Sequence, residues 1–191
     1  MKGICVGLES CPTTAPPPQQ YTAGPNSPGT VVDDATVGNI AWDSSSLNNV
    51  KVSDNVRAWA ILPNNGLIDT SHYLKATNFG FTIPSGATIN GIVVEIEKLL
   101  NQGDLTVLDN AVRIVKGGTI GSTDRSNGSA WPQVEAYVTH GGTTDLWGET
   151  LTDTDINSAS FGVAISAKEG ATTSYGQPFI DHIRITVYYT N

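Results

Sequence analysis

Hydrophobic and polar residues alternate with a period of two along several stretches of this chain. In residues 92–97, isoleucine and valine occupy every second position, and Val93 and two glutamates lie between them. Successive side chains of a β-strand point to opposite faces, so this pattern predicts a strand with one buried and one solvated face. The same alternation predicts strands in residues 161–166 and 183–189, and a shorter extended segment in residues 4–8.

Further strand-like runs lie between residues that favour turns. The turn signals are Pro63-Asn64-Asn65-Gly66, Pro84-Ser85-Gly86 and the paired glycines after two of the runs. One helical turn is predicted over residues 152–157, where Thr and Asp suit a helix N-terminus. Many short strands with frequent turns predict an all-β protein, an antiparallel β-sandwich of jelly-roll or immunoglobulin-like kind. The additional predicted strands span residues 56–62, 72–83, 111–116 and 137–139.

The first 29 residues differ in composition from the rest and are predicted to form an extended, proline-rich N-terminal arm. Fixing some twenty backbone residues costs on the order of 20–40 kcal/mol, and such a segment has too little apolar surface to offset that cost. We therefore expect the arm (1–29) to lie against another surface and the β-sandwich domain to span residues 30–191. The residues expected to contact a partner are Ile4, Val6, Leu8, Pro16, Pro17, Pro18 and Tyr21.

The composition narrows the range of partners. The chain has a formal net charge of −8, and its basic residues are scattered, whereas phosphate binding needs clustered Lys and Arg. We therefore expect no nucleic-acid partner. No apolar run approaches the roughly 18 residues of a membrane helix, so no membrane partner and no cleaved leader after Met1 are expected. Cys5 and Cys11 form either a disulfide or two free thiols.

No catalytic motif is present in the sequence. It contains neither G-x-S-x-G nor a glycine-rich phosphate loop, and its three histidines are scattered. The segment that begins at Asp153 resembles the opening of an EF-hand loop, but Ser158 and Ala164 stand where that loop needs Gly and Glu. We expect a non-enzymatic protein with no catalytic residue, cofactor or metal site. A pair of glycosidase carboxylates is retained as an alternative.

The four tryptophans allow two interpretations. Trp42, Trp59, Trp131 and Trp147 are expected to pack in the core or in a subunit interface, because each carries a large apolar surface. The alternative is that Trp59, Trp131 and Trp147 are solvent-exposed and form a platform on which sugar rings stack.

Several strand-and-turn segments resemble virion proteins of tailed bacteriophages and prophages. The resemblance extends over roughly residues 28–190, and its motifs describe an architecture rather than a catalytic signature. What it implies is a β-sandwich on a phage particle: a capsid decoration protein, a head fibre or a tail-associated module. The segments that carry it are residues 76–97, Val112-Arg-Ile-Val-Lys-Gly-Gly118, Asp145-Leu-Trp-Gly-Glu-Thr150 with Asp155-Ile-Asn157, Phe161-Gly-Val-Ala-Ile-Ser166 and residues 181–190.

The function expected from this resemblance is that of a structural virion component on the head surface, anchored by its N-terminal arm. Its partners would be the major capsid protein or another virion protein and further copies of this chain. Its location would be the virion, assembled in the cytoplasm of a bacterial host. The alternative is a carbohydrate-binding adhesin module of a phage tail or cell-surface protein, with a host-surface glycan as its partner.

Overall fold

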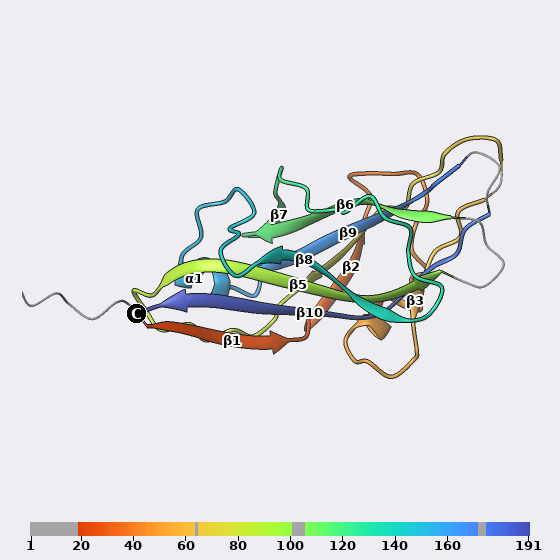
Figure 1. The fold of residues 1–191 in the computed structure, drawn as a ribbon. Coiled ribbons are helices and arrows are strands. Elements are labelled where there is room, and N and C mark those ends of the chain that lie inside the picture. The colour runs from red at the N-terminus through yellow and green to blue at the C-terminus, as the bar shows by residue number, and fades with distance from the viewer. Residues whose placement is uncertain (1–18, 64, 101–105, 172–174) are drawn as a thin grey trace, which may run out of the picture.

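The computed structural model describes residues 19–63, 65–100, 106–171 and 175–191, which form two antiparallel β-sheets packed face to face (Figure 1). This arrangement confirms the predicted all-β sandwich. Sheet A contains, in spatial order, β1 (Gln20–Asn26), β10 (Pro178–Thr190), β5 (Thr88–Leu100) and β8 (Ala136–Gly142), and β3 (Ala58–Trp59) also pairs with β10. Sheet B contains β2 (Thr30–Asp34), β4 (Tyr73–Thr77), β9 (Gly162–Glu169), β6 (Val107–Lys116) and β7 (Thr119–Ile120).

Strands that follow each other along the chain mostly lie in opposite sheets. The chain crosses between sheets at every connection from β1 to β6, and again from β7 to β10. With β4 set aside, the order β1-β10-β5-β8 faces the order β2-β9-β6-β7. This is the strand order of a jelly roll, one of the two predicted alternatives, with β4 inserted between β2 and β9.

The predicted alternation along β5 and β10 is confirmed, and it builds the core. Ile92, Val94 and Ile96 of β5 are fully buried between the sheets, while the glutamates between them are half-buried on the other face. Strand β9 differs, because its alternate residues are buried as well. A second small apolar cluster explains the difference, since Ala164 packs on the outer side of sheet B with its neighbours Tyr73, Ala111 and Val115.

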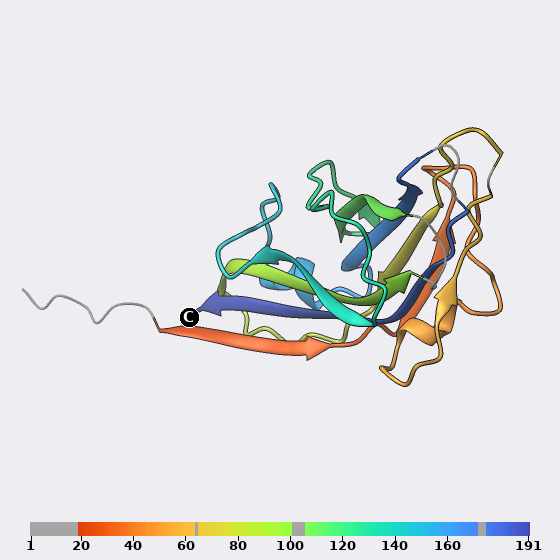
Figure 2. The ribbon, with the colours of Figure 1, turned by 45° about the vertical axis from the view of Figure 1, so that its right-hand side comes forward.

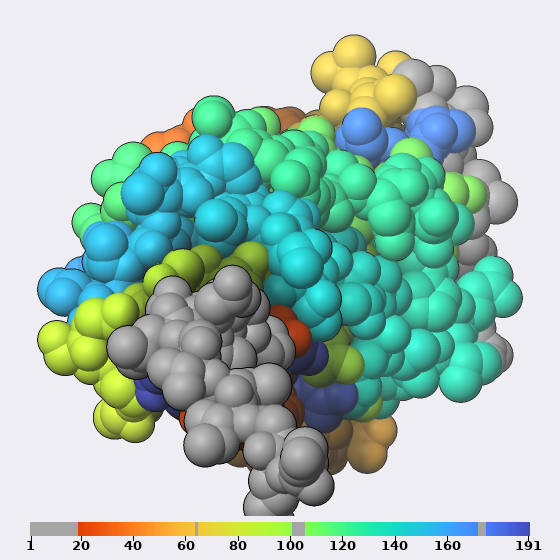
Figure 3. All heavy atoms as spheres, turned by 60° about the vertical axis from the view of Figure 1, so that its left-hand side comes forward, coloured from red at the N-terminus to blue at the C-terminus, as the bar shows by residue number. Residues whose placement is uncertain are grey.

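The boundary of the predicted arm is wrong for residues 20–26. These residues form β1, which pairs with the last strand of the sandwich from Gln20 opposite Thr190 to Asn26 opposite Ile185. The Tyr21 ring stacks on Tyr189, with ring centroids 5.6 Å apart. The red first strand and the dark blue end of β10 also meet in the space-filling view (Figure 3). An edge strand tolerates proline and glycine, which is why this composition still pairs.

Tyr21 therefore packs on a strand of its own sandwich. The other residues predicted to contact a partner, Ile4, Val6, Leu8, Pro16, Pro17 and Pro18, lie outside the described residues, as do Cys5 and Cys11.

Two short helical elements lie in the connections between strands. The helix α1 (Asp153–Asn157) begins with a capping box. The Thr152 hydroxyl accepts a hydrogen bond from the Asp155 backbone N–H, and the Asp155 carboxylate accepts one from the Thr152 backbone N–H. This helix confirms the predicted helical turn. The 3-10 helix η1 (Leu47–Val50) precedes β3, and Figure 2 shows both in orange at the end of sheet A where β10 begins. No helix among the described residues is long and apolar enough to cross a membrane.

Candidate functional site

The outer face of sheet A, which points away from the core, carries a row of large apolar side chains. The register places Trp59 of β3 opposite Phe179 of β10, and Phe179 opposite Leu99 of β5. Residues directly opposed in antiparallel strands share a face. Their chain neighbours Ala58 and Ile180 are fully buried in the core, so Trp59, Phe179 and Leu99 point outward. All three are half-buried, and we call them the apolar row.

A β-bulge places two polar residues next to the apolar row. The pairing of β10 with β5 shifts between Ile180 and His182, so that Asp181 is an extra residue and Glu97 faces both Asp181 and His182. Such a bulge re-aims the side chain of the extra residue. The Asp181 carboxylate consequently reaches the loop before β3, where its Oδ2 accepts a hydrogen bond from the Asn55 backbone N–H at 3.2 Å.

Two arginines are held rigidly on this face. Arg184 of β10 donates two hydrogen bonds of 2.9 Å to the carboxylate of Glu95 on β5, and its guanidinium lies 3.9 Å from the ring centroid of Tyr137. Arg57 donates hydrogen bonds of 2.6 and 2.9 Å to Glu135. Bidentate pairs of this kind fix both orientation and position. The outer face is thus an ordered array of planar charged groups beside an apolar row.

The same face has more negative than positive charge at its centre. One carboxylate oxygen from each of Glu97, Glu135 and Asp181 lies within 4.8 Å of the other two. Burial, together with the negative charges of Glu135, Glu97 and the nearby Asp54, raises the pKa of Asp181. We call Glu97, Glu135 and Asp181 the carboxylate triad.

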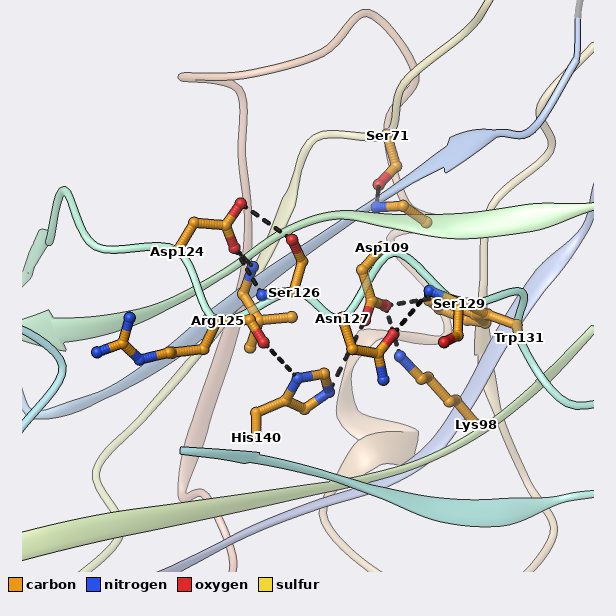
Figure 4. A network of polar contacts seen from close by, with 12 residues as sticks. Ser71, Lys98, Asp109, Asp124, Arg125, Ser126, Asn127, Ser129, Trp131 and His140 are labelled. Atoms are coloured by element: carbon orange, nitrogen blue, oxygen red, sulfur yellow. Dashed lines mark hydrogen bonds and ion pairs between the residues drawn. The ribbon is translucent and has the colours of Figure 1, made fainter. Parts of the chain in front are cut away.

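A second polar cluster lies inside the sandwich (Figure 4). Asp109 of β6 accepts hydrogen bonds through Oδ1 from Lys98 Nζ at 2.5 Å and from Trp131 Nε1 at 2.8 Å. His140 Nε2 of β8 lies 3.8 Å from Asp109 Oδ2. Lys98, Asp109, Trp131 and His140 are each no more than 3% exposed. We call them the buried network, and because solvent does not reach it, its role is to join β6 of sheet B to β5 and β8 of sheet A.

The hydrogen bonds of His140 determine its tautomer. Nδ1 lies 2.8 Å from the backbone oxygen of Arg125, and a carbonyl only accepts, so Nδ1 carries the proton. In the neutral ring, Nε2 then presents a lone pair toward Asp109 Oδ2, and neither atom has a hydrogen-bond partner among the described residues. Burial and the charge of Lys98 lower the pKa of His140.

We expect this buried histidine to make the protein less stable in mild acid. Its folded-state pKa lies below the unfolded value of about 6.5, so the unfolded chain binds the proton first as the pH falls. The free energy of unfolding should fall below about pH 6.5, by up to about 1.4 kcal/mol per pH unit, until the folded-state pKa is reached. Urea unfolding between pH 5 and 8 measures this dependence.

The matched variant is His140→Asn, whose amide retains a donor for the Arg125 carbonyl. Burial also lowers the pKa of His182, but that residue is present in both proteins, so the difference between the two curves isolates His140. Parallel curves would show that His140 does not carry the expected dependence.

The structure corrects the predicted tryptophan platform. Trp131 and Trp147 are 3% and 1% exposed, and their indole N–H groups bond Asp109 and the Ile92 backbone oxygen. They cannot form a sugar-stacking surface, whereas core packing is confirmed for them and for Trp42. Of the three residues, only Trp59 is on an accessible face, and its neighbours in the apolar row are Phe179 and Leu99 instead of other tryptophans.

The sequence contains part of the signal for the carboxylate triad. Glu97 lies on the polar phase of a predicted strand, and Asp181 lies two residues before another. Their convergence with Glu135 depends on the neighbouring positions of β10, β5 and β8 and on the bulge at Asp181. None of these features can be deduced from spacing along the chain.

A shallow cavity of about 300 Å³ lies on the other sheet. It is lined by Asp34 at the end of β2, by Thr36 and by residues 118–120 around β7. The carboxylate of Asp34 is already paired with Lys75 and with the Thr36 hydroxyl. With its charged group occupied, this cavity offers fewer groups for a ligand than the outer face of sheet A does.

Comparison with known proteins identifies no family for the chain. No family model and no curated protein sequence matches it. Among solved structures, one described as "CBM4 structure and function" is 12% identical, with a TM-score of 0.41 over 81% of this chain and 92% of that chain. TmCBM61 in complex with β-1,4-galactotriose is 9% identical, with a TM-score of 0.37 over 80% and 90% of the two chains. These TM-scores are too low to assign a ligand to this chain.

Proposed function

We propose that this protein is a carbohydrate-binding module and that the outer face of sheet A is its binding face. The observation that carries the proposal is that the register orders three rows along one face of sheet A. The apolar row comes first, the row that contains Glu97 and Tyr137 second, and the bidentate Arg184–Glu95 pair third. This proposal takes the predicted glycan-binding alternative and moves its site from three tryptophans to one tryptophan with different neighbours.

The chemistry of a sugar ring fits such a face. A pyranose has C–H groups on its two flat sides, which pack on aromatic rings, and hydroxyl groups around its edge, which need donors and acceptors. Trp59 and Phe179 supply apolar area, and Arg184, Glu95, Arg57 and Glu135 supply planar polar groups already fixed by their partners. A preformed site loses little side-chain entropy when the ligand binds.

The charge of the face favours neutral glycans. The carboxylate triad, Asp54 and Glu95 outnumber the two arginines, and the whole chain has a net charge of −8. Uronic-acid and sulfated glycans would meet like charges on approach. We therefore propose uncharged oligosaccharides as the ligand class.

The carboxylates on this face support binding of a glycan without its hydrolysis. A glycosidase needs two carboxyl groups that reach the scissile bond from opposite sides, roughly 5–10 Å apart. Asp181 is only 1% exposed, and both oxygens of Glu135 accept hydrogen bonds from Arg57. The predicted enzyme alternative is tested by the release of reducing sugar from any glycan that binds.

Replacing Trp59 by alanine is expected to weaken glycan binding at least tenfold. Such a change corresponds to about 1.4 kcal/mol, which the loss of aromatic contact area readily supplies. The measurement is a glycan array of neutral and anionic oligosaccharides, followed by calorimetry with the strongest neutral binder from the array.

The matched control is Tyr21→Ala, an aromatic residue of the same sheet that stacks on Tyr189 away from the apolar row. It should retain wild-type affinity, and thermal unfolding should show that both variants are folded. An array without any binder, or equal affinity of Trp59→Ala and the wild type, would contradict the proposal.

The virion role stays a prediction from the resemblance. Apart from Tyr21 in β1, the residues predicted to anchor the protein lie outside the described residues. The capsid partner, the homo-oligomer and the virion location therefore stay predictions as well. A glycan-binding sandwich is compatible with a tail-associated module.

A further inference from the structure

We propose that Glu97, Glu135 and Asp181 form a binding site for a divalent cation, and that this cation is Ca²⁺. The three carboxylates come from β5, from the segment before β8 and from the bulge in β10. One oxygen of each lies within 4.8 Å of the other two. A point between three such oxygens is no more than about 2.8 Å from each, close to the 2.3–2.6 Å of Ca²⁺–oxygen contacts.

Two buried oxygens without hydrogen-bond partners point independently to a ligand. Asp181 is 1% exposed, and its Oδ1 has no partner among the described residues, although Oδ2 bonds the Asn55 N–H. Glu97 Oε2 is buried and without a partner as well. Nearly all buried polar atoms in proteins are satisfied, and a buried carboxylate without compensation is costly. A cation bound by the triad would compensate the carboxylates of both residues.

The positive groups nearby do not fill this role. Arg57 directs its guanidinium to both oxygens of Glu135, and Arg184 directs its own to Glu95. Asp54 adds a further negative charge near Asp181. Both arginines lie near the triad, but with Asp54 and Glu95 included the carboxylates number five against these two arginines, so the site retains net negative charge for a divalent ion.

The donor set selects among the common cations. Zn²⁺ prefers nitrogen and sulfur ligands, but both ring nitrogens of the adjacent His182 are taken, Nε2 by Ser27 Oγ and Nδ1 by Tyr137 OH, each at 2.8 Å. The triad therefore offers oxygen atoms only, which suit Ca²⁺ and Mg²⁺. Three carboxylates on three separate segments favour the larger ion, because Ca²⁺ accepts irregular geometry while Mg²⁺ requires a near-ideal octahedron with several waters.

The position of the site suggests what the cation would do. Asp181 holds the loop at Asn55, and Glu135 holds the same loop through Arg57. A cation that binds both carboxylates would fix this loop, and with it Trp59, against sheet A. The cation site rests on the triad alone and does not depend on whether the outer face binds a glycan.

Calorimetric titration of the full chain, stripped with EDTA, with CaCl2 at constant ionic strength tests the proposal. We expect one Ca²⁺ per chain, a higher midpoint of thermal unfolding in Ca²⁺, and weaker binding of MgCl2. Glu97→Gln and Asp181→Asn should each lower the Ca²⁺ affinity at least tenfold. Glu149→Gln, a half-buried carboxylate outside the triad, is the matched control and should bind as the wild type does.

One result separates a cation site from a merely structural carboxylate. In EDTA, Asp181→Asn should unfold at the same temperature as the wild type or higher, because it removes an uncompensated buried charge, and Ca²⁺ should no longer stabilise it. If that variant does not fold, Glu97→Gln decides, since Glu97 is half-exposed. No Ca²⁺ binding up to about 10 mM, beyond the range of weak extracellular sites, or unchanged affinity in the variants, would overturn the proposal.

Discussion

Replacing Asp109 with alanine is expected to lower the free energy of unfolding by about 3–5 kcal/mol, the usual cost of removing one partner of a buried ion pair. The side chains of Lys98 and Asp109 are 2% and 0% exposed. Without Asp109, the contact that remains for the Lys98 ammonium among the described residues is the Trp131 ring, whose centroid lies 4.6 Å from Nζ. Burial already lowers the pKa of Lys98, and Asp109 opposes that effect. Urea unfolding at pH 7 measures the loss.

A double-mutant cycle shows whether this cost belongs to the pair. Asp109→Asn retains an acceptor for the Trp131 N–H, and Lys98→Met retains most of the lysine volume without its charge. The double variant should be more stable than the sum of the single losses predicts, by about 0.5–3 kcal/mol. Strict additivity would show that the two side chains do not interact as the buried network requires.

Replacing Trp147 with alanine is expected to cost about 3–5 kcal/mol of unfolding free energy, as for other fully buried aromatic residues. Trp147 is 1% exposed, and its indole N–H donates a 3.0 Å hydrogen bond to the Ile92 backbone oxygen. Its ring packs so closely on Gly141 that a Cβ at that glycine would lie 2.6 Å from Nε1. Gly141 therefore has no side chain that could fill the space left by the indole.

The matched comparison is Trp59→Ala, which removes a half-buried indole from the outer face of the same sheet. It should cost clearly less stability than Trp147→Ala, while only Trp59→Ala weakens glycan binding beyond what a change in the folded fraction explains. Equal losses of stability would contradict the distinction between a core and a binding-face tryptophan. Chemical denaturation and calorimetry on both variants provide the two readouts.

The sequence predicts those parts of this fold that depend on local patterns. Alternation along residues 92–97 and 183–189 predicts β5 and β10, and the residues that favour a helix N-terminus predict α1. The turn signal Pro84-Ser85-Gly86 also forms a turn, in which the Ala87 N–H donates to the Pro84 oxygen and Gly86 has a φ of +83°.

Features that depend on which strands become neighbours could not be predicted. Trp131 and Trp147 lie in the connections before and after β8, and only the packing of these connections against the sheets makes them core residues while Trp59 lies on the surface. Proline and glycine conceal β1 in the sequence, because the strand with which it pairs, β10, lies at the other end of the chain. The carboxylate triad also depends on the β-bulge, in which Asp181 is an extra residue of β10 beside Glu97.

Mapping by NMR of an isotope-labelled chain tests most directly whether the outer face of sheet A binds glycans. The titrant is the strongest neutral oligosaccharide from the array, and backbone amide shifts are followed during the titration. The largest changes should fall on residues 57–59, 95–99, 135–137 and 179–184, with the strands of sheet B little affected. Largest changes on β2, β4, β6 or β7, or no saturable change at all, would contradict the account.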